Sequence, residues 1–253
     1  MHRHLMCLAL IATASRASAQ LTTATTDDKT ASVGIPAGWK LAKGSKGYVY
    51  VTGPNDERVN LGVIVIGKNA PPGTALDGEV AFALPFSATL QEKFTTILQA
   101  GAAKQGMAKP EITIASAIPT KLPMCSRLLG STTAGTDSRK FESVICSLQP
   151  DWLGLYKNIV FLLEVPASRA AQDRPIVEQI AASYRVTPDM FKKMLAPYTA
   201  RPPQPQGGGA MPAAMPGLAP YQDPTNSDCF DYTVIRESPP WEVPMHCGGI
   251  KPY

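Results

Sequence analysis

The sequence predicts an α+β domain in which an antiparallel β-sheet is flanked by helices, followed by a Pro/Gly-rich linker and a small disulfide-closed tail. Short runs rich in β-branched and aromatic residues recur between turn residues, as in strands. Two segments carry apolar residues at helical spacing. A third segment is dominated by proline and glycine and has little to bury. The expected organisation is a leader at residues 1–19, a flexible lead-in at 20–30, an α/β sandwich domain at 31–196, the linker at 197–220 and the tail at 221–253.

Strands are expected at five places along the domain. Residues 31–40 combine an extended apolar start, a Pro-Ala-Gly turn and a tryptophan. Residues 48–52 alternate as strands do, and the β-branched run at residues 61–66 predicts an interior strand. Further strands are expected at residues 111–117 and 155–165, with a β-hairpin between them.

The first helical segment runs from about residue 76 to residue 106. We expect a kink at Pro85, because proline breaks the hydrogen-bond ladder inside a helix. Its inward stripe contains Leu90, Phe94, Ile97 and Leu98.

A second helix is expected to begin at Asp173 as its N-cap, with Pro175 tolerated in the first turn. Its inner side contains Ile176, Val177, Ile180 and Tyr184. Thr187 and the proline after it predict the start of a short third helix that ends at Leu195.

The first 19 residues have the features of a cleavable secretory signal. A short basic start precedes an apolar run at residues 5–13, and small residues ending in Ala17-Ser18-Ala19 fit the A-x-A cleavage rule. The apolar run is shorter than the roughly 20 residues that cross a bilayer, which argues against the alternative of a membrane anchor. The sequence predicts export to the periplasm or the extracellular medium, with no transmembrane segment in the mature chain.

The charge of the mature chain is close to neutral. Without Arg3 and Arg16 of the leader, 22 basic residues face 20 acidic ones, which leaves a net charge of about +2 with histidine neutral. The mature chain has no dense run of lysine and arginine. We therefore expect no nucleic-acid partner and no anionic membrane surface.

An even number of cysteines in an oxidising compartment suggests two disulfides. The residues around Gly135-Thr136 read as a hairpin with a type II′ turn. In that register Cys125 faces Cys146 as a non-hydrogen-bonded pair, which leaves Cys229–Cys247 as the second bridge. The alternative is unpaired buried thiols.

The same register divides the hairpin into two faces. One face carries Leu128, Phe141 and Ile145. The other face carries the Cys125–Cys146 pair together with Arg127, Lys140 and Glu142. We therefore expect the bridge to lie on the more polar face.

The chain resembles the PsbP/Mog1-like α/β/α sandwich. The resemblance covers about residues 30–196 and rests on the Ile35-Pro36-Ala37-Gly38-Trp39 opening and on the order strand, strand, long helix, antiparallel strands, helix. It implies an antiparallel sheet covered by helices on both faces. Members of this group are mostly non-enzymatic assembly factors, complex subunits and small binding proteins. The resemblance carries no site residue, and the linker and tail lie outside it.

No catalytic, cofactor-binding or metal-binding motif stands out. His246 is the only histidine after the leader, which argues against a Ser-His-Asp hydrolase and a multi-histidine metal site. The glycines at 207–209 lie in the linker with no strand or helix beside them, so they are not a phosphate cradle. Four tail residues offer oxygen ligands that could hold calcium, but their spacing does not match an EF-hand loop, and the pattern is more typical of polar turn residues beside a disulfide. These residues are Asp223, Asn226, Asp228 and Asp231.

Aromatic residues are the best candidates for partner contacts. Trp152 follows a predicted turn and is either a lid over the core or a contact residue. The tail, which carries Phe230, Tyr232 and Trp241, is too short to build its own core, so it docks either on its own domain or on another protein. The remaining aromatics near the start of the domain, which are either core residues or the lining of a groove, are Trp39, Tyr48 and Tyr50.

We expect an exported, non-enzymatic binding or assembly protein of the cell envelope, with a protein partner and without a cofactor. A carrier of a small ligand is one form of this function. The first alternative is a hydrolase that uses Asp and Glu alone, which needs two carboxylates about 5 to 10 Å apart in a cleft. The second alternative is a secreted effector.

Overall fold

The computed structural model describes residues 20–122 and 124–198. The predicted leader, almost all of the linker and the cysteine-containing tail lie outside these residues. Cys229, Cys247, Phe230, Tyr232 and Trp241 therefore remain predictions.

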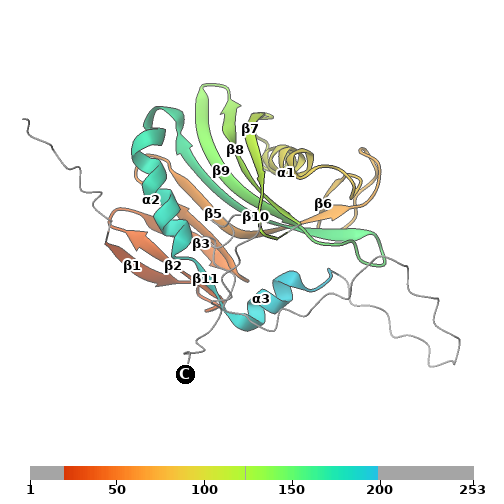
Figure 1. Cartoon of the computed structure of the whole chain (residues 1–253), viewed down its shortest axis with the longest axis horizontal. Coiled ribbons are helices and arrows are strands. Elements are labelled where there is room, and N and C mark those ends of the chain that lie inside the picture. The colour runs from red at the N-terminus through yellow and green to blue at the C-terminus, as the bar shows by residue number, and fades with distance from the viewer. Residues whose placement is uncertain (1–19, 123, 199–253) are drawn as a thin grey trace, which may run out of the picture.

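The described residues form two β-sheets and three α-helices (Figure 1). The large sheet has the order β3-β4-β5-β10-β9-β8-β7, with β6 beside β5, and the small sheet has the order β1-β2-β11. The strands of the large sheet are β3 (Lys40–Ser45), β4 (Tyr48–Thr52), β5 (Arg58–Lys68), β6 (Val80–Ala83), β7 (Glu111–Pro119), β8 (Cys125–Ala134), β9 (Asp137–Ser147) and β10 (Leu155–Pro166). The remaining elements are β1 (Leu21–Thr25), β2 (Ala31–Pro36), β11 (Arg185–Val186), α1 (Leu90–Lys104), the 3-10 turn η1 (Ala167–Arg169), α2 (Ala170–Ala182) and α3 (Pro188–Leu195).

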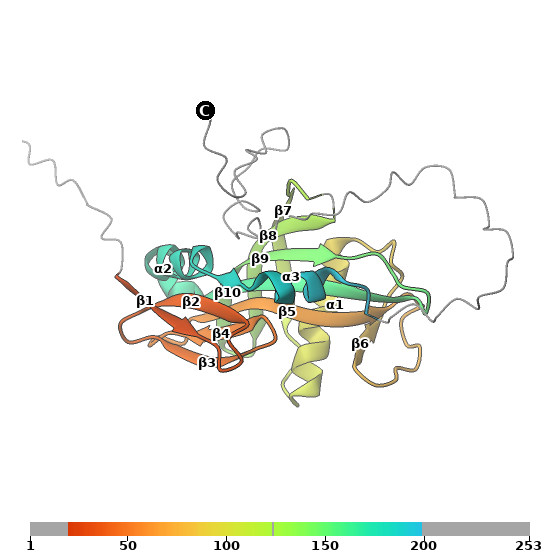
Figure 2. The same ribbon diagram turned by 90° about the horizontal axis from the view of Figure 1, so that it is seen from below.

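Helices cover both faces of the large sheet. In Figure 1, α1 and α2 flank the central strands from opposite sides. The small sheet, α2 and α3 pack on one face, and α1 packs on the other. Figure 2 shows α3 lying across β9 and β10, where the Lys157 ammonium group donates to the carbonyl oxygen of Lys193 at 2.9 Å. The predicted antiparallel sheet with helices on both faces is confirmed, with β6 as its one parallel addition to β5.

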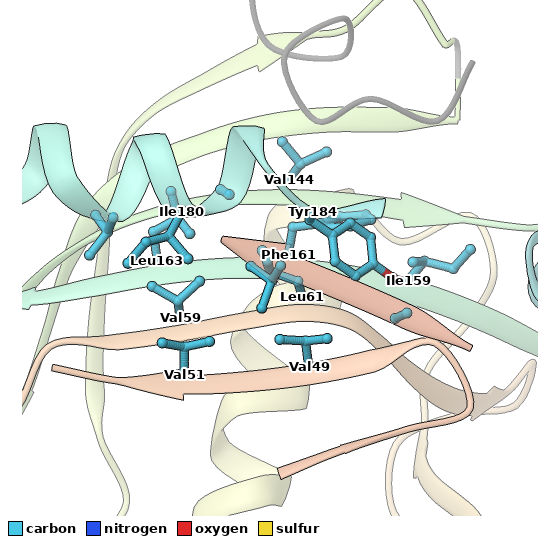
Figure 3. Packing of buried hydrophobic residues seen from close by; sticks show 14 of the residues in the cluster. Val49, Val51, Val59, Leu61, Val144, Ile159, Phe161, Leu163, Ile180 and Tyr184 are labelled. Atoms are coloured by element: carbon cyan, nitrogen blue, oxygen red, sulfur yellow. The ribbon is translucent and has the colours of Figure 1, made fainter. Parts of the chain in front are cut away.

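The first core lies between the large sheet and the layer of α2, α3 and β2. Figure 3 shows its centre, where Tyr184 stands edge-on to Phe161 with ring centroids 6.0 Å apart. The Tyr184 hydroxyl donates to the carbonyl oxygen of Gly47 at 2.5 Å. Gly62 lies below this hydroxyl with φ of +71°, and a Cβ atom there would come within 2.5 Å of the tyrosine oxygen. The tyrosine therefore needs a glycine at this point of β5.

The second core lies between the large sheet and α1. Phe94 and Ile97 of the predicted stripe are buried, and Leu90 and Leu98 pack against them. The sheet side of this core includes Leu128, Phe141 and Ile145, the three residues expected on one face of the hairpin.

The predicted start of the first helix is wrong. Residues 80–83 form strand β6, and α1 begins at Leu90. Thr89 caps this helix: its hydroxyl accepts a hydrogen bond from the backbone N–H of Glu92, and the Glu92 carboxylate accepts one from the backbone N–H of Thr89. Pro85 therefore lies in a connection and causes no kink.

Two further expectations are wrong at element ends. Helix α2 begins at Ala170, so Asp173 is not its N-cap but a buried first-turn residue paired with Arg169 at 2.8 Å. Residues 20–30, expected as a flexible lead-in, contain β1, which pairs with β2 along its whole length. Threonine-rich segments suit an edge strand as well as a loop.

The hairpin prediction is confirmed in register. Ala134 faces Asp137 across a turn in which Gly135 has φ of +61°, and Cys125 is bonded to Cys146. The expectation that the bridge lies on the more polar face of the hairpin is confirmed, since the register places Cys125 and Cys146 on the side of Arg127 and Glu142. The charged residues lie farther along the strands, and both cysteines are buried in the first core.

No helix in the described part of the chain is long and apolar enough to cross a membrane.

Candidate functional site

A cavity of ≈ 440 Å³ lies between the first half of α2 and strands β7 to β10. We call it the α2 groove. Figure 1 shows α2 beside β9 and β10, with β8 and β7 continuing beyond the helix. Because α2 covers only part of this face, the sheet beyond it forms the other wall. The apolar residues that line it are Ala115, Leu129, Phe141, Leu163, Val165, Ala170, Ala171 and Val177.

Two cross-strand rows build the floor of the groove. The first row places Leu129 of β8, Glu142 of β9 and Leu163 of β10 side by side. The second row places Lys140 of β9 beside Val165 of β10. Each row therefore sets a charged side chain next to apolar side chains, and both rows face α2.

Glu142 is the buried ionic centre of the groove, with its side chain 3% exposed. The Arg127 guanidinium group donates to both of its oxygens, at 2.9 and 3.1 Å. Arg174 of α2 donates to one of these oxygens at 2.9 Å and, through its Nε atom, to Glu178 at 2.8 Å. A carboxylate this deeply buried is costly unless its oxygens are paired, so both arginines stabilise it.

Glu142 and Glu178 stabilise the charged form of Arg174. Burial alone would lower the pKa of Arg174, but the hydrogen bond and charge of Glu178 and those of Glu142 outweigh burial and raise the pKa. Arg174 therefore links α2 to the sheet as a permanent cation.

Lys140 adds a further positive charge to the groove. Its side chain is exposed, and it forms no salt bridge with the described residues. Among the groove residues and Arg127, three cations face the two carboxylates of Glu142 and Glu178. The groove thus combines an apolar floor with one unbalanced positive charge.

The sequence-predicted contact residues do not meet in this groove. Trp152 lies in the β9–β10 connection, 58% exposed, and belongs to a different end of the sheet. Trp39, Tyr48 and Tyr50 are partly buried and do not line the cavity. Tyr48 instead donates to the Asn60 side chain at 3.0 Å.

The groove was missed because its helix comes from elsewhere in the sequence. The hairpin register already placed Arg127, Lys140 and Glu142 on one face, which is a visible signal of a charged surface. The contributions of Arg174 and Glu178 require α2 to lie over this face, and the hairpin sequence does not contain that information.

A second polar cluster lies inside the second core. The Lys93 ammonium group donates to the Ser147 hydroxyl at 3.1 Å and to the carbonyl oxygen of Phe86 at 2.7 Å. Burial lowers the pKa of Lys93 to about 8. A serine beside a lysine can act as a nucleophile and its base. Here Lys93 and Ser147 are only 2% and 5% exposed and line no described cavity, so a substrate has no access to them.

Two buried carboxyl groups lie in α2 and in the β4–β5 turn. Glu57 accepts hydrogen bonds from the backbone and the side chain of Asn55, at 2.8 and 2.9 Å. Glu57 is 1% exposed and Asp173 is 2% exposed. Neither residue lines the described cavity. Asp173 is paired with Arg169 and Glu57 with Asn55.

No group of three or more metal-ligating side chains comes together in residues 20–122 and 124–198.

Comparison with known proteins finds similarity to solved structures. No protein-family model matches the chain, and no curated protein matches its sequence. The PsbP protein of Synechocystis is 16% identical, covering 67% of this chain and 94% of its own, with a TM-score of 0.37. The Ran-binding protein Mog1p of Saccharomyces cerevisiae is 9% identical, with coverages of 71% and 100% and a TM-score of 0.38. LpqN of Mycobacterium tuberculosis, involved in cell envelope biogenesis, is 12% identical, with coverages of 66% and 91% and a TM-score of 0.31.

Solved structures of PsbP and Mog1 are thus among the neighbours, as the resemblance in the sequence led us to expect. The antiparallel sheet with helices on both faces is established by this chain's own strands and helices. Identities of 9% to 16% transfer no function. The function has to be argued from the groove itself.

Proposed function

We propose that this protein is an exported, non-enzymatic binding protein of the cell envelope whose ligand site is the α2 groove. The observation that carries the proposal is the groove itself, a ≈ 440 Å³ cavity with an apolar floor and a few convergent charged groups. Ligand sites commonly have volumes of about 300 to 1,000 Å³ and this kind of lining.

The lining defines the chemistry of the ligand. Leucine, valine and alanine side chains on both walls suit an apolar body. The unbalanced Lys140 ammonium group suits an acidic group at the mouth. We therefore expect a small amphipathic ligand with an apolar body and one anionic group.

The floor is suited to binding because its shape is held rigidly. Arg127 and Arg174 fix Glu142 from two directions, one from the neighbouring strand and one from the helix. A site held in its bound shape loses less conformational entropy when the ligand arrives.

The hydrolase alternative is less well supported. Glu142 and Glu178 are two carboxyl groups lining one cavity, which is what that alternative requires. However, Arg174 donates to both groups, and Arg127 donates to Glu142 as well. A general acid must carry a proton and face the scissile bond, whereas these oxygens face guanidinium groups. Turnover of chromogenic glycosides that is lost in Glu178→Gln would restore the hydrolase alternative.

Export remains part of the proposal and has one supporting observation. The Cys125–Cys146 disulfide is formed in the core of the domain. Such bonds persist mainly in oxidising compartments.

The test uses two fluorescent probes with a common aromatic body. 1-Anilinonaphthalene-8-sulfonate carries one anionic group, and N-phenyl-1-naphthylamine carries none. Ala171→Trp fills the groove from an exposed helix position, and Gln172→Trp places the same side chain at the adjacent exposed position, which does not line the groove. We expect Ala171→Trp to weaken binding of both probes at least about tenfold and Gln172→Trp to leave it within about twofold.

The charge is tested by Lys140→Gln. We expect this variant to weaken binding of the sulfonate probe by about fivefold to tenfold and to leave binding of the neutral probe unchanged. Unchanged binding in Ala171→Trp, or equal losses in both tryptophan variants, would show that the probes bind elsewhere and would overturn the groove assignment.

A further inference from the structure

Exposed large apolar side chains gather at one end of the large sheet. Six such side chains occur among the described residues, and Met107 is the one that lies elsewhere. We call the other five the apolar rim, which consists of Leu76, Ile118, Leu122, Trp152 and Leu153. Single exposed apolar side chains are common on protein surfaces, whereas several gathered at one place mark an interaction surface.

The strand pairings place all five residues at the same end. Leu76 lies between β5 and β6, and Trp152 and Leu153 lie between β9 and β10. Ile118 lies near the end of β7, and Leu122 lies in the β7–β8 turn. The first residue of β10 pairs with the last residue of β5, and the first residue of β8 pairs with Cys146 near the end of β9. The β5–β6 and β9–β10 connections also touch directly, through a hydrogen bond from the Asn69 N–H to the Gly154 carbonyl oxygen at 2.8 Å.

Met107 marks the opposite end of the sheet. It lies in the connection between α1 and β7, and β7 begins with a pairing to Thr133, next to the tip of the β8–β9 hairpin. The α2 groove also lies toward that end, since its β8 and β9 residues are close to the same tip. The rim and the groove are therefore separate surfaces.

The described chain reaches its last residues at the rim. Lys157, near the start of β10, donates to the carbonyl oxygen of Lys193 in the last turn of α3. Three residues after that helix, the Tyr198 hydroxyl donates to Glu79, just before β6, at 3.2 Å. Figure 1 shows the end of α3 beside the β9–β10 and β5–β6 connections. Residues 199–253 thus continue from the end of the sheet that carries the exposed apolar side chains.

We propose that the C-terminal segment 221–253 docks on the apolar rim of its own domain through Phe230, Tyr232 and Trp241. This segment has five aromatic side chains, among them Phe230, Tyr232 and Trp241, and too few residues to bury them in a core of its own. The rim supplies the missing apolar partner. The rim does not depend on the function proposed for the groove.

The linker allows this contact. The rim crosses the strands from β5 to β7, which is four strand spacings or about 19 Å. If the 31 residues between Tyr198 and Phe230 are treated as a flexible coil, their root-mean-square length is about 30 Å. A tether of this length holds its end near the rim at roughly millimolar effective concentration, well above that of a free partner.

The first experiment is photo-crosslinking of the full mature chain. Leu122 is replaced by p-benzoylphenylalanine at the rim, and Met107 is replaced in the same way at the opposite end as the matched control. We expect position 122 to crosslink within the same chain to peptides from residues 221–253, and position 107 to give no such product. Crosslinks from position 122 to a second copy, to another protein or to no tail peptide would overturn the proposal.

The second experiment is hydrogen exchange of the full chain. In the Leu122→Ser and Trp152→Ser double variant, we expect amides of residues 226–250 to exchange at least about tenfold faster than in the wild type, which equals a loss of about 1.4 kcal/mol. Met107→Ser is the control and should leave these amides unchanged. Equal exchange of the tail in all three proteins would contradict docking on the rim. Binding of the probes in the groove should be the same in all three.

Discussion

Lys93 is a buried amine without a carboxylate partner among residues 20–122 and 124–198. Its ammonium group lies 4.2 Å from the ring centroid of Phe86 and donates to Ser147 and to a backbone carbonyl oxygen. Burial lowers its pKa from 10.5 to about 8. A helix position that faces an apolar core is normally occupied by leucine or methionine. Burying the charged ammonium group of Lys93 there lowers the stability of the folded protein at neutral pH.

Stability should therefore rise with pH over the range in which Lys93 titrates. Between pH 8 and 10.5 the unfolded chain keeps this proton and the folded chain releases it, so the unfolded state binds more protons and the free energy of unfolding increases by up to about 1.4 kcal/mol per pH unit. Burial raises the pKa of Tyr48 and Tyr156 to about 12, which reverses the trend above about pH 10 as unfolded tyrosines ionise first. Urea unfolding at pH 8.0 and 9.5 should show the rise in the wild type. Lys93→Met should remove most of it and leave the part that comes from Lys157, whose pKa burial also lowers. An equal rise in the variant would assign it to another group.

The two arginines that pair with Glu142 in the groove should contribute unequally to stability. Arg127 is the less exposed partner of Glu142, at 18% against 47% for Arg174, and it engages both carboxylate oxygens. Arg127→Met should therefore cost about 3 kcal/mol of unfolding free energy, and Arg174→Met clearly less. In a double-mutant cycle with Glu142→Gln, the loss from Arg127→Met should shrink, because no buried carboxylate is then left uncompensated. Additive losses would contradict the pairing.

At the scale of elements, the start of a helix is encoded locally when a side chain at its N-cap makes the capping hydrogen bond. Thr187 predicts the start of α3, and the structure places its hydroxyl as the acceptor of the Met190 N–H. At α1 the start is marked by a different signature, the capping box of Thr89 and Glu92, but the helix predicted from about residue 76 also took in the apolar residues of β6. The start of α2 has no such signal, because Arg169 at its N-cap makes no capping hydrogen bond with its side chain.

The cap of α1 can be tested directly. Thr89→Ala removes the acceptor for the Glu92 N–H and breaks the reciprocal bond, so we expect a loss of about 1 kcal/mol. Thr89→Ser retains the hydroxyl oxygen and should stay within about 0.5 kcal/mol of the wild type. Chemical denaturation measures both variants, and equal losses would show that the methyl group of threonine, rather than its hydroxyl, is what matters.

The β8–β9 hairpin is the element that sequence predicted best. The turn type, the pairing of every residue and the Cys125–Cys146 bond follow from one two-residue loop. The burial of the bridge did not follow from it, because the hairpin alone does not show that both cysteines join the core cluster to which α2 and α3 also contribute.

The bridge should contribute to the stability of the whole domain. It closes a loop of 21 residues, for which chain entropy gives about 3 kcal/mol. Replacing Cys125 and Cys146 together by alanine should lower the melting temperature by about 6 to 12 °C for a domain of this size. Replacing Cys229 and Cys247 together is the matched control and should leave the main transition nearly unchanged. A larger shift in the control would place the tail within the cooperative core.

At the scale of the molecule, the class of fold was predictable and the site was not. Element order and apolar periodicity predict that one sheet is covered on both faces, because strands with apolar residues on both sides must bury each side against another layer. The α2 groove depends instead on how far a single helix reaches across one face. Its charged residues come from β8, β9 and α2, and only the first two are linked by a local turn.

The two cores also predict how the domain behaves without its tail. Both cores are closed by residues 21–195, and the last helix is tied down by Lys157 within that range. A chain ending at Tyr198 should therefore keep the circular dichroism spectrum and the groove binding of the full protein. Its apolar rim loses its partner, so we expect a lower melting temperature by a few degrees and a greater tendency to self-associate in sedimentation experiments. Loss of the folded spectrum would show that the tail completes a core, whereas an unchanged melting temperature without self-association would show that the rim is not where the tail docks.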